Sequence, residues 1–279
     1  MANILDGKAL AKKIKQQVAA EAASLPRTPG LAVILVGENP ASQVYVRGKE
    51  KDCQECGIRN LGRKLPADTS EEELLALIAE MNADPAVDGI LVQLPLPKHI
   101  DEGKVLRAIS PAKDVDCFHP ENVGEMMVGD PICWPCTPFG VMELLREYGI
   151  SASGKHCVVL GRSNIVGKPM TLLLLRDNGT VTVCHSKTPD LKEQCLKADI
   201  LVAAVGKVNL VTADMVKEGA VVIDVAMNRD ENGKLCGDVD YAAVSQKASY
   251  ITPVPGGVGP MTRAILMKNV LAAAKDHQK

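Results

Sequence analysis

Short runs of apolar residues alternate, along most of the chain, with segments in which apolar residues recur every three or four positions. The uninterrupted runs predict buried strands, and the three-to-four spacing predicts helices that bury one face. Strands that alternate with helices are typical of α/β layers built around parallel sheets. The pattern therefore predicts an α/β fold.

The first half of the chain contains three predicted strands and two predicted helices. Gly37 ends the first apolar run, and Ser70 and Glu73 are placed as the capping box of a helix. Residues 111–138 are rich in proline and have little periodicity, so we expect a long loop that serves function or joins domains. The predicted strands are 31–36, 59–65 and 89–94, and the predicted helices are 40–56 and 71–82.

The alternation is more regular in the second half, where Pro169 suits the first turn of a helix. The predicted strands are 156–160, 181–185, 200–205 and 220–225, and the predicted helices are 139–148, 168–176, 191–197, 213–217 and 262–275. We expect the last helix to pack back on the first half. The predicted domains are therefore 1–137, completed by the helix at 260–279, and 138–259.

Composition narrows the possible functions of the two domains. The length of 279 residues suits two domains of about 150 residues each. Lys and Arg number 32 against 34 Asp and Glu, and aromatic residues make up 3%, so neither a basic surface nor a stacking platform for nucleic acid is expected. No apolar run approaches the ~20 residues of a membrane span, and the first residues lack a signal-peptide core. We expect a cytoplasmic protein without nucleic-acid or membrane partners.

Nine cysteines are present, and two pairs have C-x-x-C spacing, Cys53 with Cys56 and Cys133 with Cys136. Such spacing could form a four-thiolate zinc site. However, the first pair lies in a helix-like pattern, prolines crowd the second, and nine cysteines produce such spacings by chance. The five histidines form no ligand pair. We predict reduced thiols and no metal.

The segment after the predicted strand at 156–160 is a glycine-bounded loop that leads into a helix. Backbone N–H groups at such a helix start suit an anion. A P-loop requires one residue fewer between the glycines, and a nucleophile elbow requires glycine at Ile165. The dinucleotide fingerprint is closer, although Ser163 replaces its middle glycine, and a tight structural turn would look similar. The strand-and-helix units that follow favour a Rossmann-like nucleotide-binding sheet.

The next predicted strand ends at residues 185–188, which read His-Ser-Lys-Thr. An acid there would bind the ribose hydroxyl of NAD and repel a 2′-phosphate. Arg162, Ser163 and Ser186 could instead hold that phosphate. The residues therefore favour NADP over NAD.

A second group of polar residues lies in the first half. Tyr45 and Lys49 are four residues apart and share a helix face, Gln93 ends an apolar strand, and Asp114 and Asp116 lie in the long loop. Each residue alone suits a structural role. Together they predict an active-site cleft between the two domains.

Six ordered motifs then identify a family. The chain resembles the bifunctional methylenetetrahydrofolate dehydrogenase/cyclohydrolase family over practically its whole length. The motifs are SQVYV at 42–46 with Lys49, Lys51 and Cys53, DGILVQLPLP at 88–97, KDVD at 113–116, PCTP at 135–138, GRSNIVGKP at 161–169 and TPVPGGVGPMT at 252–262.

The resemblance implies an NADP-dependent oxidation of 5,10-methylenetetrahydrofolate to the methenyl compound, and then hydrolysis to 10-formyltetrahydrofolate. Such an enzyme serves one-carbon metabolism and purine biosynthesis, and a homodimer is expected. The implied catalytic residues are Lys49, Gln93, Asp116 and Tyr45. The implied folate-binding residues are Tyr45, Lys49, Val92, Gln93, Leu94, Asp116, Pro255, Gly256, Gly257, Pro260 and Thr262, and the implied cofactor-binding residues are Gly161, Arg162, Ser163, Gly167, Ser186 and Met227.

Two places depart from the family pattern. Cys117 stands where the family usually has glycine, which could shift the loop that carries Asp116. Ala226 and Met227 replace a glycine and a branched residue, where we expect the nicotinamide end of the cofactor. The alternatives are a dehydrogenase without cyclohydrolase activity, an NAD-preferring enzyme, and a nucleotide-binding regulatory module that has lost catalysis.

Overall fold

The computed structural model describes residues 1–129 and 131–278, which form two compact units. One unit, here the glycine-loop unit, comprises residues 1–11 and 137–262, and the other, here the Lys49 unit, comprises residues 12–136 and 263–279. Both are α/β, as the pattern predicted. None of the described helices is long and apolar enough to cross a bilayer.

The Lys49 unit is built on a parallel sheet around β2 (Gly30–Val36), whose seven residues are all buried. β3 (Arg59–Asn60) and β4 (Arg63–Leu65) pair with one edge of β2, and β5 (Gly89–Val92) pairs with the other. The single strand predicted at 59–65 is therefore wrong, because the chain bends away between β3 and β4. A Cβ at Gly62 would lie 2.6 Å from the carbonyl oxygen of Val33, so glycine permits this close passage.

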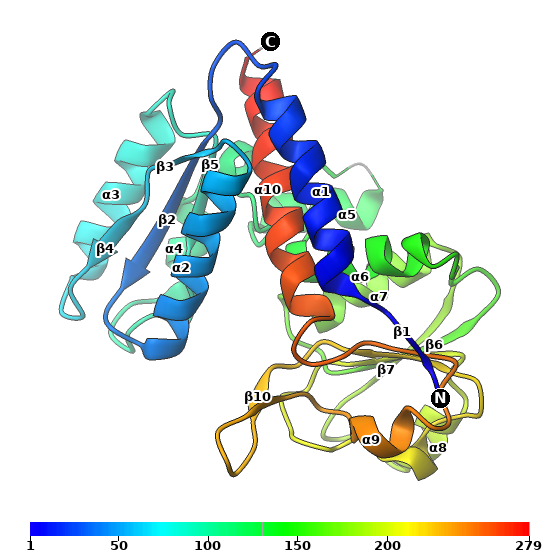
Figure 1. Cartoon of the computed structure of the whole chain (residues 1–279). Helices are drawn as coiled ribbons and strands as arrows, with labels where there is room; N and C mark the ends of the chain where they lie inside the picture. Colours follow the sequence, from blue (N-terminus) through cyan, green and yellow to red (C-terminus); the bar gives the residue numbers. More distant parts are fainter. Residues whose placement is uncertain (130, 279) are drawn as a thin grey trace. The chain divides into compact units, whose positions relative to one another are not determined.

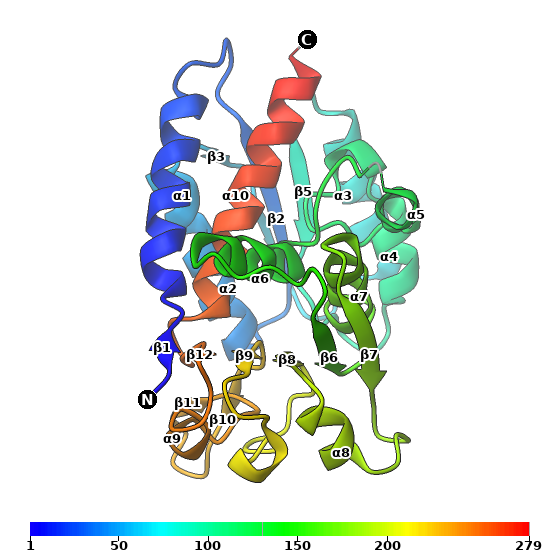
Figure 2. The same ribbon diagram turned by 90° about the vertical axis from the view of Figure 1, so that its right-hand side faces the viewer.

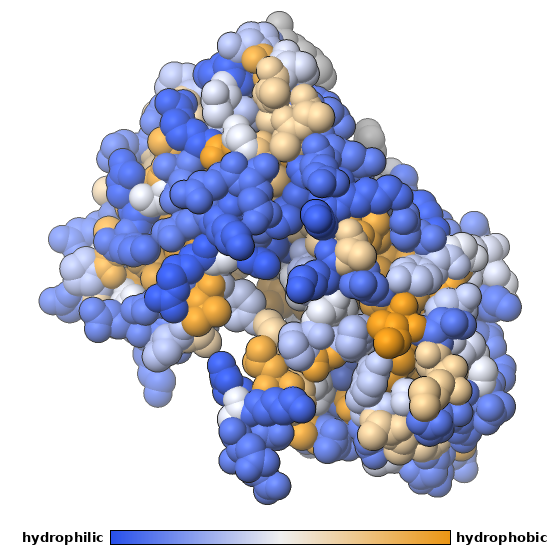
Figure 3. Space-filling view, viewed as in Figure 1, coloured by the Kyte–Doolittle hydropathy of each residue, from blue (hydrophilic) through white to orange (hydrophobic). Residues whose placement is uncertain are grey.

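Helices cover both faces of this sheet (Figure 1). α3 (Glu71–Ala83) and α4 (Glu102–Ala108) pack on the face that carries Ile34 and Ile90. α2 (Pro40–Glu55), α1 (Gly7–Ala22) and α10 (Val258–His277) lie on the other side, where Val270 approaches Gly89. The capping box of Ser70 and Glu73 is confirmed. Over α1 and α2 the surface is mostly hydrophilic (Figure 3).

The proline-rich segment at 111–138 is not the predicted loop. It contains the 3₁₀ turn η1 (Pro111–Lys113), the helix α5 (Pro120–Val128) and the start of α6 (Cys136–Glu147). Pro111 and Pro120 occupy the first turn of their helices, where the missing N–H costs no hydrogen bond. The prolines therefore begin helices here, although their density had suggested irregular chain.

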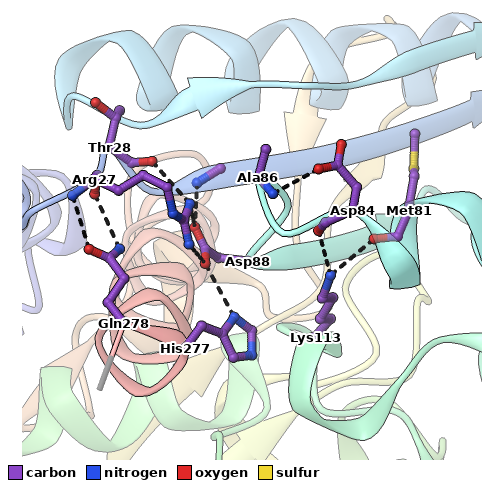
Figure 4. Close-up of polar contacts among 10 residues, drawn as sticks. Arg27, Thr28, Met81, Asp84, Ala86, Asp88, Lys113, His277 and Gln278 are labelled. Atoms are coloured by element: carbon purple, nitrogen blue, oxygen red, sulfur yellow. Dashed lines mark hydrogen bonds and ion pairs between the residues drawn. The ribbon is translucent and has the colours of Figure 1, made fainter.

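A buried carboxylate fastens the end of α10 to the sheet of the Lys49 unit (Figure 4). Asp88 is fully buried, and its two oxygens accept hydrogen bonds from Arg27 at 2.6 and 2.9 Å. The same carboxylate accepts from the backbone N–H of Gly30 at 2.8 Å and lies 3.2 Å from Nδ1 of His277. Gln278 adds two hydrogen bonds to the backbone of Arg27. These contacts explain why a helix from the end of the chain belongs to this unit.

The glycine-loop unit has a six-stranded, fully parallel sheet in the order β1-β12-β9-β8-β6-β7. Its α6 and α7 (Gly167–Arg176) cover one face, and α8 (Leu191–Leu196) and α9 (Tyr241–Val244) lie on the other (Figure 2). The strands are β6 (His156–Leu160), β7 (Thr180–Cys184), β8 (Ile200–Ala203), β9 (Val221–Asp224), β12 (Tyr250–Ile251) and β1 (Asn3–Ile4), and a hairpin of β10 (Asn228–Arg229) and β11 (Leu235–Cys236) is added. The order reverses at β6, since β7 and β8 lie on opposite sides of it. Nucleotides bind at such switch points.

Three details of this unit differ from the sequence prediction. Residues 213–217 contain a 3₁₀ turn, η2 (Ala213–Met215), in place of a helix. The last helix begins at Val258, before the predicted residue 262. The first eleven residues join this unit, because Asn3 and Ile4 extend the sheet beside β12. A two-residue strand leaves too short a pattern to be read from the sequence.

We predict that Asp88→Asn lowers the free energy of unfolding by about 2–4 kcal/mol at neutral pH, because it removes the charge from a buried ion pair. Burial alone would raise the pKa of Asp88, but the hydrogen bonds from Arg27, Gly30 and His277 outweigh it and lower that pKa. The stabilisation is thus present at neutral pH and is lost as the pH falls below the ordinary aspartate range. Thermal unfolding at neutral and acidic pH tests this, with the exposed Asp68→Asn as the control. Equal melting temperatures of Asp88→Asn and the wild type at neutral pH would contradict this prediction.

Candidate functional site

Lys49 and Gln93 form the centre of the candidate site in the Lys49 unit. Lys49 comes from α2, and Gln93 follows the carboxyl end of β5. The Nζ of Lys49 donates a hydrogen bond of 3.0 Å to Oε1 of Gln93. The amide of Gln93 is held in turn, because its Nε2 donates to the carbonyl oxygen of Leu94 at 2.8 Å. The predicted neighbours therefore meet, and the amide oxygen is fixed toward the amine.

The amine of Lys49 lies in a poorly solvated place. Only 9% of the residue is exposed. Burial lowers the pKa of Lys49, and the nearby charge of Arg263 lowers it further, whereas the carboxylate of Asp116 acts in the opposite direction. A lysine whose pKa is lowered gives up its proton more readily than an ordinary lysine. The local environment therefore suits an amine that acts as a base.

Asp116, beyond η1, lies close enough to Lys49 to act on its charge. Cys136 lies beside the carboxylate, and burial followed by that charge raises the pKa of the thiol well above its ordinary value. Cys136 thus stays a neutral thiol that donates to the carbonyl oxygen of Val115 at 3.4 Å. It is a packing residue of the site.

Cys117 occupies a backbone conformation that favours glycine, the residue that the resemblance led us to expect at this position. The residue has a φ of +61° and is buried, so it adopts the left-handed conformation that glycine adopts readily. The turn is therefore of the glycine type despite the side chain. The Cys117 thiol donates to the carbonyl oxygen of Cys133 at 3.4 Å, and this contact stabilises the turn next to Asp116.

Sequence reasoning missed two residues around Lys49. Arg263, on α10, influences the charges of both Tyr45 and Lys49, and it forms an ion pair of 3.2 Å with Asp52. Asp52 is buried and also pairs with Lys15 at 2.8 Å. Asp52 is three residues after Lys49 and so shares its helix face, which was the available signal. Tyr45 lies on this face as well and is 38% exposed, as a ring that stacks on a ligand requires.

Other folate-binding residues implied by the resemblance lie near Gln93 or in the glycine-loop unit. Val92 is buried in β5, and Leu94 is half-buried after it. Pro255, Gly256 and Gly257 lie in the connection from β12 to α10, and Pro260 and Thr262 lie in the first turns of α10.

The glycines of this connection are required by close packing. The backbone oxygen of Gly257 lies 1.8 Å from the place that a Cβ on Gly7 would occupy, and a Cβ on Gly257 itself would meet Pro253 at 2.7 Å. The carbonyl oxygen of Gly256 accepts a hydrogen bond from the N–H of Lys8. The hydroxyls of Thr262 and Thr137 are 2.9 Å apart. The start of α10 is therefore fixed to the N-terminal segment.

The glycine loop has the close packing that a phosphate-binding turn requires. Gly161 has a φ of +112°, and a Cβ there would lie 2.3 Å from the carbonyl oxygen of Ala204. A Cβ on Gly167 would lie 2.3 Å from the carbonyl oxygen of Gly161. The hydroxyl oxygen of Ser163 accepts from the N–H groups of Val166 and Gly167, at 3.2 Å each. The hydroxyl hydrogen is left to donate to an anion.

The remaining candidate cofactor residues lie at the same edge of the sheet. Leu160 pairs with Cys184 and Ala203, and Ala203 pairs with Asp224, so β6, β7, β8 and β9 end in register. Arg162 and Ser186 follow β6 and β7 and are exposed, and Met227, which follows β9, is 41% exposed. The carboxyl edge of a parallel sheet is where a dinucleotide binds.

Among residues 1–129 and 131–278, no three His, Cys, Asp or Glu side chains converge as a metal site. The two C-x-x-C pairs lie in separate segments, one at the end of α2 and the other just before and at the start of α6.

Comparisons with known proteins agree with this arrangement. Residues 5–116 match the model of the tetrahydrofolate dehydrogenase/cyclohydrolase catalytic domain, and residues 135–278 match that of its NAD(P)-binding domain. The bifunctional protein FolD of Magnetococcus marinus is 60% identical over 99% of this chain and 98% of its own.

Two solved structures are similar over the whole chain. The bifunctional FolD methylenetetrahydrofolate dehydrogenase/cyclohydrolase of Campylobacter jejuni superimposes with a TM-score of 0.96 at 51% identity, covering 99% of each chain. The Trypanosoma brucei FolD, crystallised with NADP and an inhibitor, has a TM-score of 0.95 at 43% identity, covering 99% of this chain and 98% of its own. The chain therefore belongs to the tetrahydrofolate dehydrogenase/cyclohydrolase family of bifunctional, NAD(P)-binding enzymes.

Proposed function

We propose that the chain oxidises 5,10-methylenetetrahydrofolate with NADP and hydrolyses the resulting 5,10-methenyl cation to 10-formyltetrahydrofolate. The observation that carries the proposal is the buried amine of Lys49, oriented by Gln93 at 3.0 Å and influenced by Asp116. The names of the FolD relatives support the same pair of reactions.

The oxidation depends more on the alignment of the methylene carbon with the nicotinamide ring than on acid–base chemistry. NADP, when bound, supplies the acceptor for the hydride that leaves the methylene carbon. Gly161 and Gly167 fit a dinucleotide, because a Cβ at either position would collide with backbone. In the proposal, the Ser163 hydroxyl donates to a phosphate of the cofactor, and Arg162 and Ser186 hold the 2′-phosphate. The NADP in the T. brucei structure supports this choice of cofactor.

The hydrolysis requires a group that takes a proton from water. Once Lys49 has lost its proton, the amine has an electron pair that can accept one, and the hydrogen bond to Gln93 holds the nitrogen in place. A bound methenyl cation beside the amine would lower the pKa of Lys49 beyond the effect of burial. In the proposal Asp116 binds the pterin and Tyr45 stacks on the folate. Val92 and Leu94 border it from the sheet, together with the 255–262 segment.

The proposal assigns the folate to the Lys49 unit and NADP to the glycine-loop unit. It also includes a homodimer in the cytoplasm that serves one-carbon metabolism and purine biosynthesis. A dehydrogenase without cyclohydrolase activity or an inactive regulatory module is less well supported, because Lys49, Gln93 and Asp116 are all present and the first two are bonded.

We predict that Lys49→Met separates the two activities. The substitution keeps the length of the side chain but removes the nitrogen, so cyclohydrolase activity should fall by about 10² to 10⁴. Dehydrogenase activity should fall less, because hydride transfer depends mainly on how the folate is positioned. The decay of methenyltetrahydrofolate and the reduction of NADP are measured on the same preparation, with thermal melting as the check on folding. Equal losses would make Lys49 a shared positioning residue, and unchanged hydrolysis would refute its role as a base.

We further predict that Arg162→Ala raises the KM for NADP by about tenfold or more and changes the KM for NAD much less. The expected loss is one charge-assisted contact to the 2′-phosphate, worth about 1.5–3 kcal/mol. Initial rates with both cofactors test this. The control is Arg176→Ala at the other end of α7, far from the glycine loop along the helix. Equal effects of Arg162→Ala on the two cofactors would rule out this role.

A further inference from the structure

The carboxylate of Asp238 binds several backbone N–H groups at the cofactor edge of the glycine-loop unit. It is fully buried and accepts four hydrogen bonds. The donors are the backbone N–H groups of Val205 at 2.6 Å, Gly206 at 3.1 Å and Lys207 at 2.6 Å, and the side-chain Nδ2 of Asn228 at 3.0 Å. Three of these donors are backbone N–H groups and the fourth is a side-chain amide.

These donors come from two different loops of the carboxyl edge. Residues 205–207 follow β8, and Asn228 follows β9, directly after Met227. The first loop starts beside the glycine turn, because the carbonyl oxygen of Ala204 lies against Gly161. Asp238 therefore joins two loops that border the proposed cofactor site, while its own backbone lies beyond β11.

A second buried carboxylate holds Asp238 in place. Asp224, at the end of β9, accepts hydrogen bonds from the backbone N–H groups of Ala226, Asp238 and Val239, at 3.2, 3.0 and 2.9 Å. Burial raises the pKa of Asp224 to about 6, so it is largely ionised at neutral pH and can accept all three. Gly237 is required here, because a Cβ would lie 1.9 Å from a carboxylate oxygen of Asp224.

We propose that Asp238 is a positioning residue that holds the loops after β8 and β9 in the conformation that receives the nicotinamide half of NADP. The inference rests on the proposed function and assigns a role to a residue outside the predicted cofactor set. The hydrogen bonds described for the Asp238 carboxylate reach the loops after β8 and β9 and not the glycine turn or Arg162. Loss of this carboxylate should therefore affect the nicotinamide half and spare the adenosine 2′-phosphate half.

The test compares two ligands on purified Asp238→Asn protein. The amide can accept from fewer donors than the carboxylate and places its own N–H₂ against backbone N–H groups, so the two loops lose their common anchor. Calorimetric titration should show NADP binding weakened about tenfold or more, and adenosine 2′,5′-bisphosphate binding within about twofold of wild type. Hydrogen exchange at residues 205–207 should accelerate, and exchange at 161–168 should not.

Matched variants separate positioning from general destabilisation. Asp199→Asn changes a carboxylate at the opposite, amino edge of the same sheet, where it accepts from His156 N–H at 2.9 Å and Lys217 at 2.6 Å. This control should lower the melting temperature without changing the ratio of the two affinities. Asn228→Ala removes one donor only, and should change the ratio in the same direction as Asp238→Asn but less. It provides the test should Asp238→Asn not fold.

If the wild-type chain binds both ligands, two results would overturn this inference and leave the proposed function intact. One is that Asp238→Asn weakens the binding of NADP and of the bisphosphate equally. The other is that it weakens neither. Failure of the wild-type chain to bind NADP would contradict the proposed function, and the inference with it. The wild-type titration thus distinguishes the two failures.

Discussion

Burial of the Lys49 amine is the constraint on which the proposed chemistry depends. Water around an ammonium group favours its charged form, so an amine that is to accept a proton must be poorly solvated. The fold achieves this by placing Lys49 on the inward side of α2, with Gln93 from β5 as its hydrogen-bond partner. Asp116 limits the shift of the pKa, and Arg263 increases it. The site therefore combines, around one amine, groups that lower its pKa and a carboxylate that raises it.

Buried carboxylates fix the loops and helix ends around both candidate sites. Asp52 pairs with Lys15 and Arg263 beside Lys49. Asp88 fastens the end of α10, and Asp238 joins two loops of the cofactor edge. Asp88 and Asp238 each accept several hydrogen bonds, and Asp52 has one hydrogen bond from Lys15 and an ion pair with Arg263. A buried charge without such partners would destabilise the fold. Site geometry in this protein thus depends on ionic groups that contact no substrate in the proposed mechanism.

The sequence predicted the strands and the main helices because each buries a local, periodic apolar pattern. It did not predict α1, although Leu10, Ile14 and Val18 recur at helical spacing and are buried. It also placed a loop over α5, because the segment is rich in proline and has little periodicity, whereas Pro120 in fact begins the helix. Lys49 and Gln93 were predicted through motifs. Asp238 and Arg263 could not be, because their contacts join residues far apart in sequence.

The proposed hydrolysis requires that Lys49 has a lowered pKa in the folded protein. NMR titration of the chain with isotope-labelled lysine measures this directly, and the missing signal in Lys49→Met assigns the resonance. We expect a titration midpoint for Lys49 below 10.5, the ordinary lysine value. A midpoint at or above that value would show that burial does not lower the pKa of Lys49.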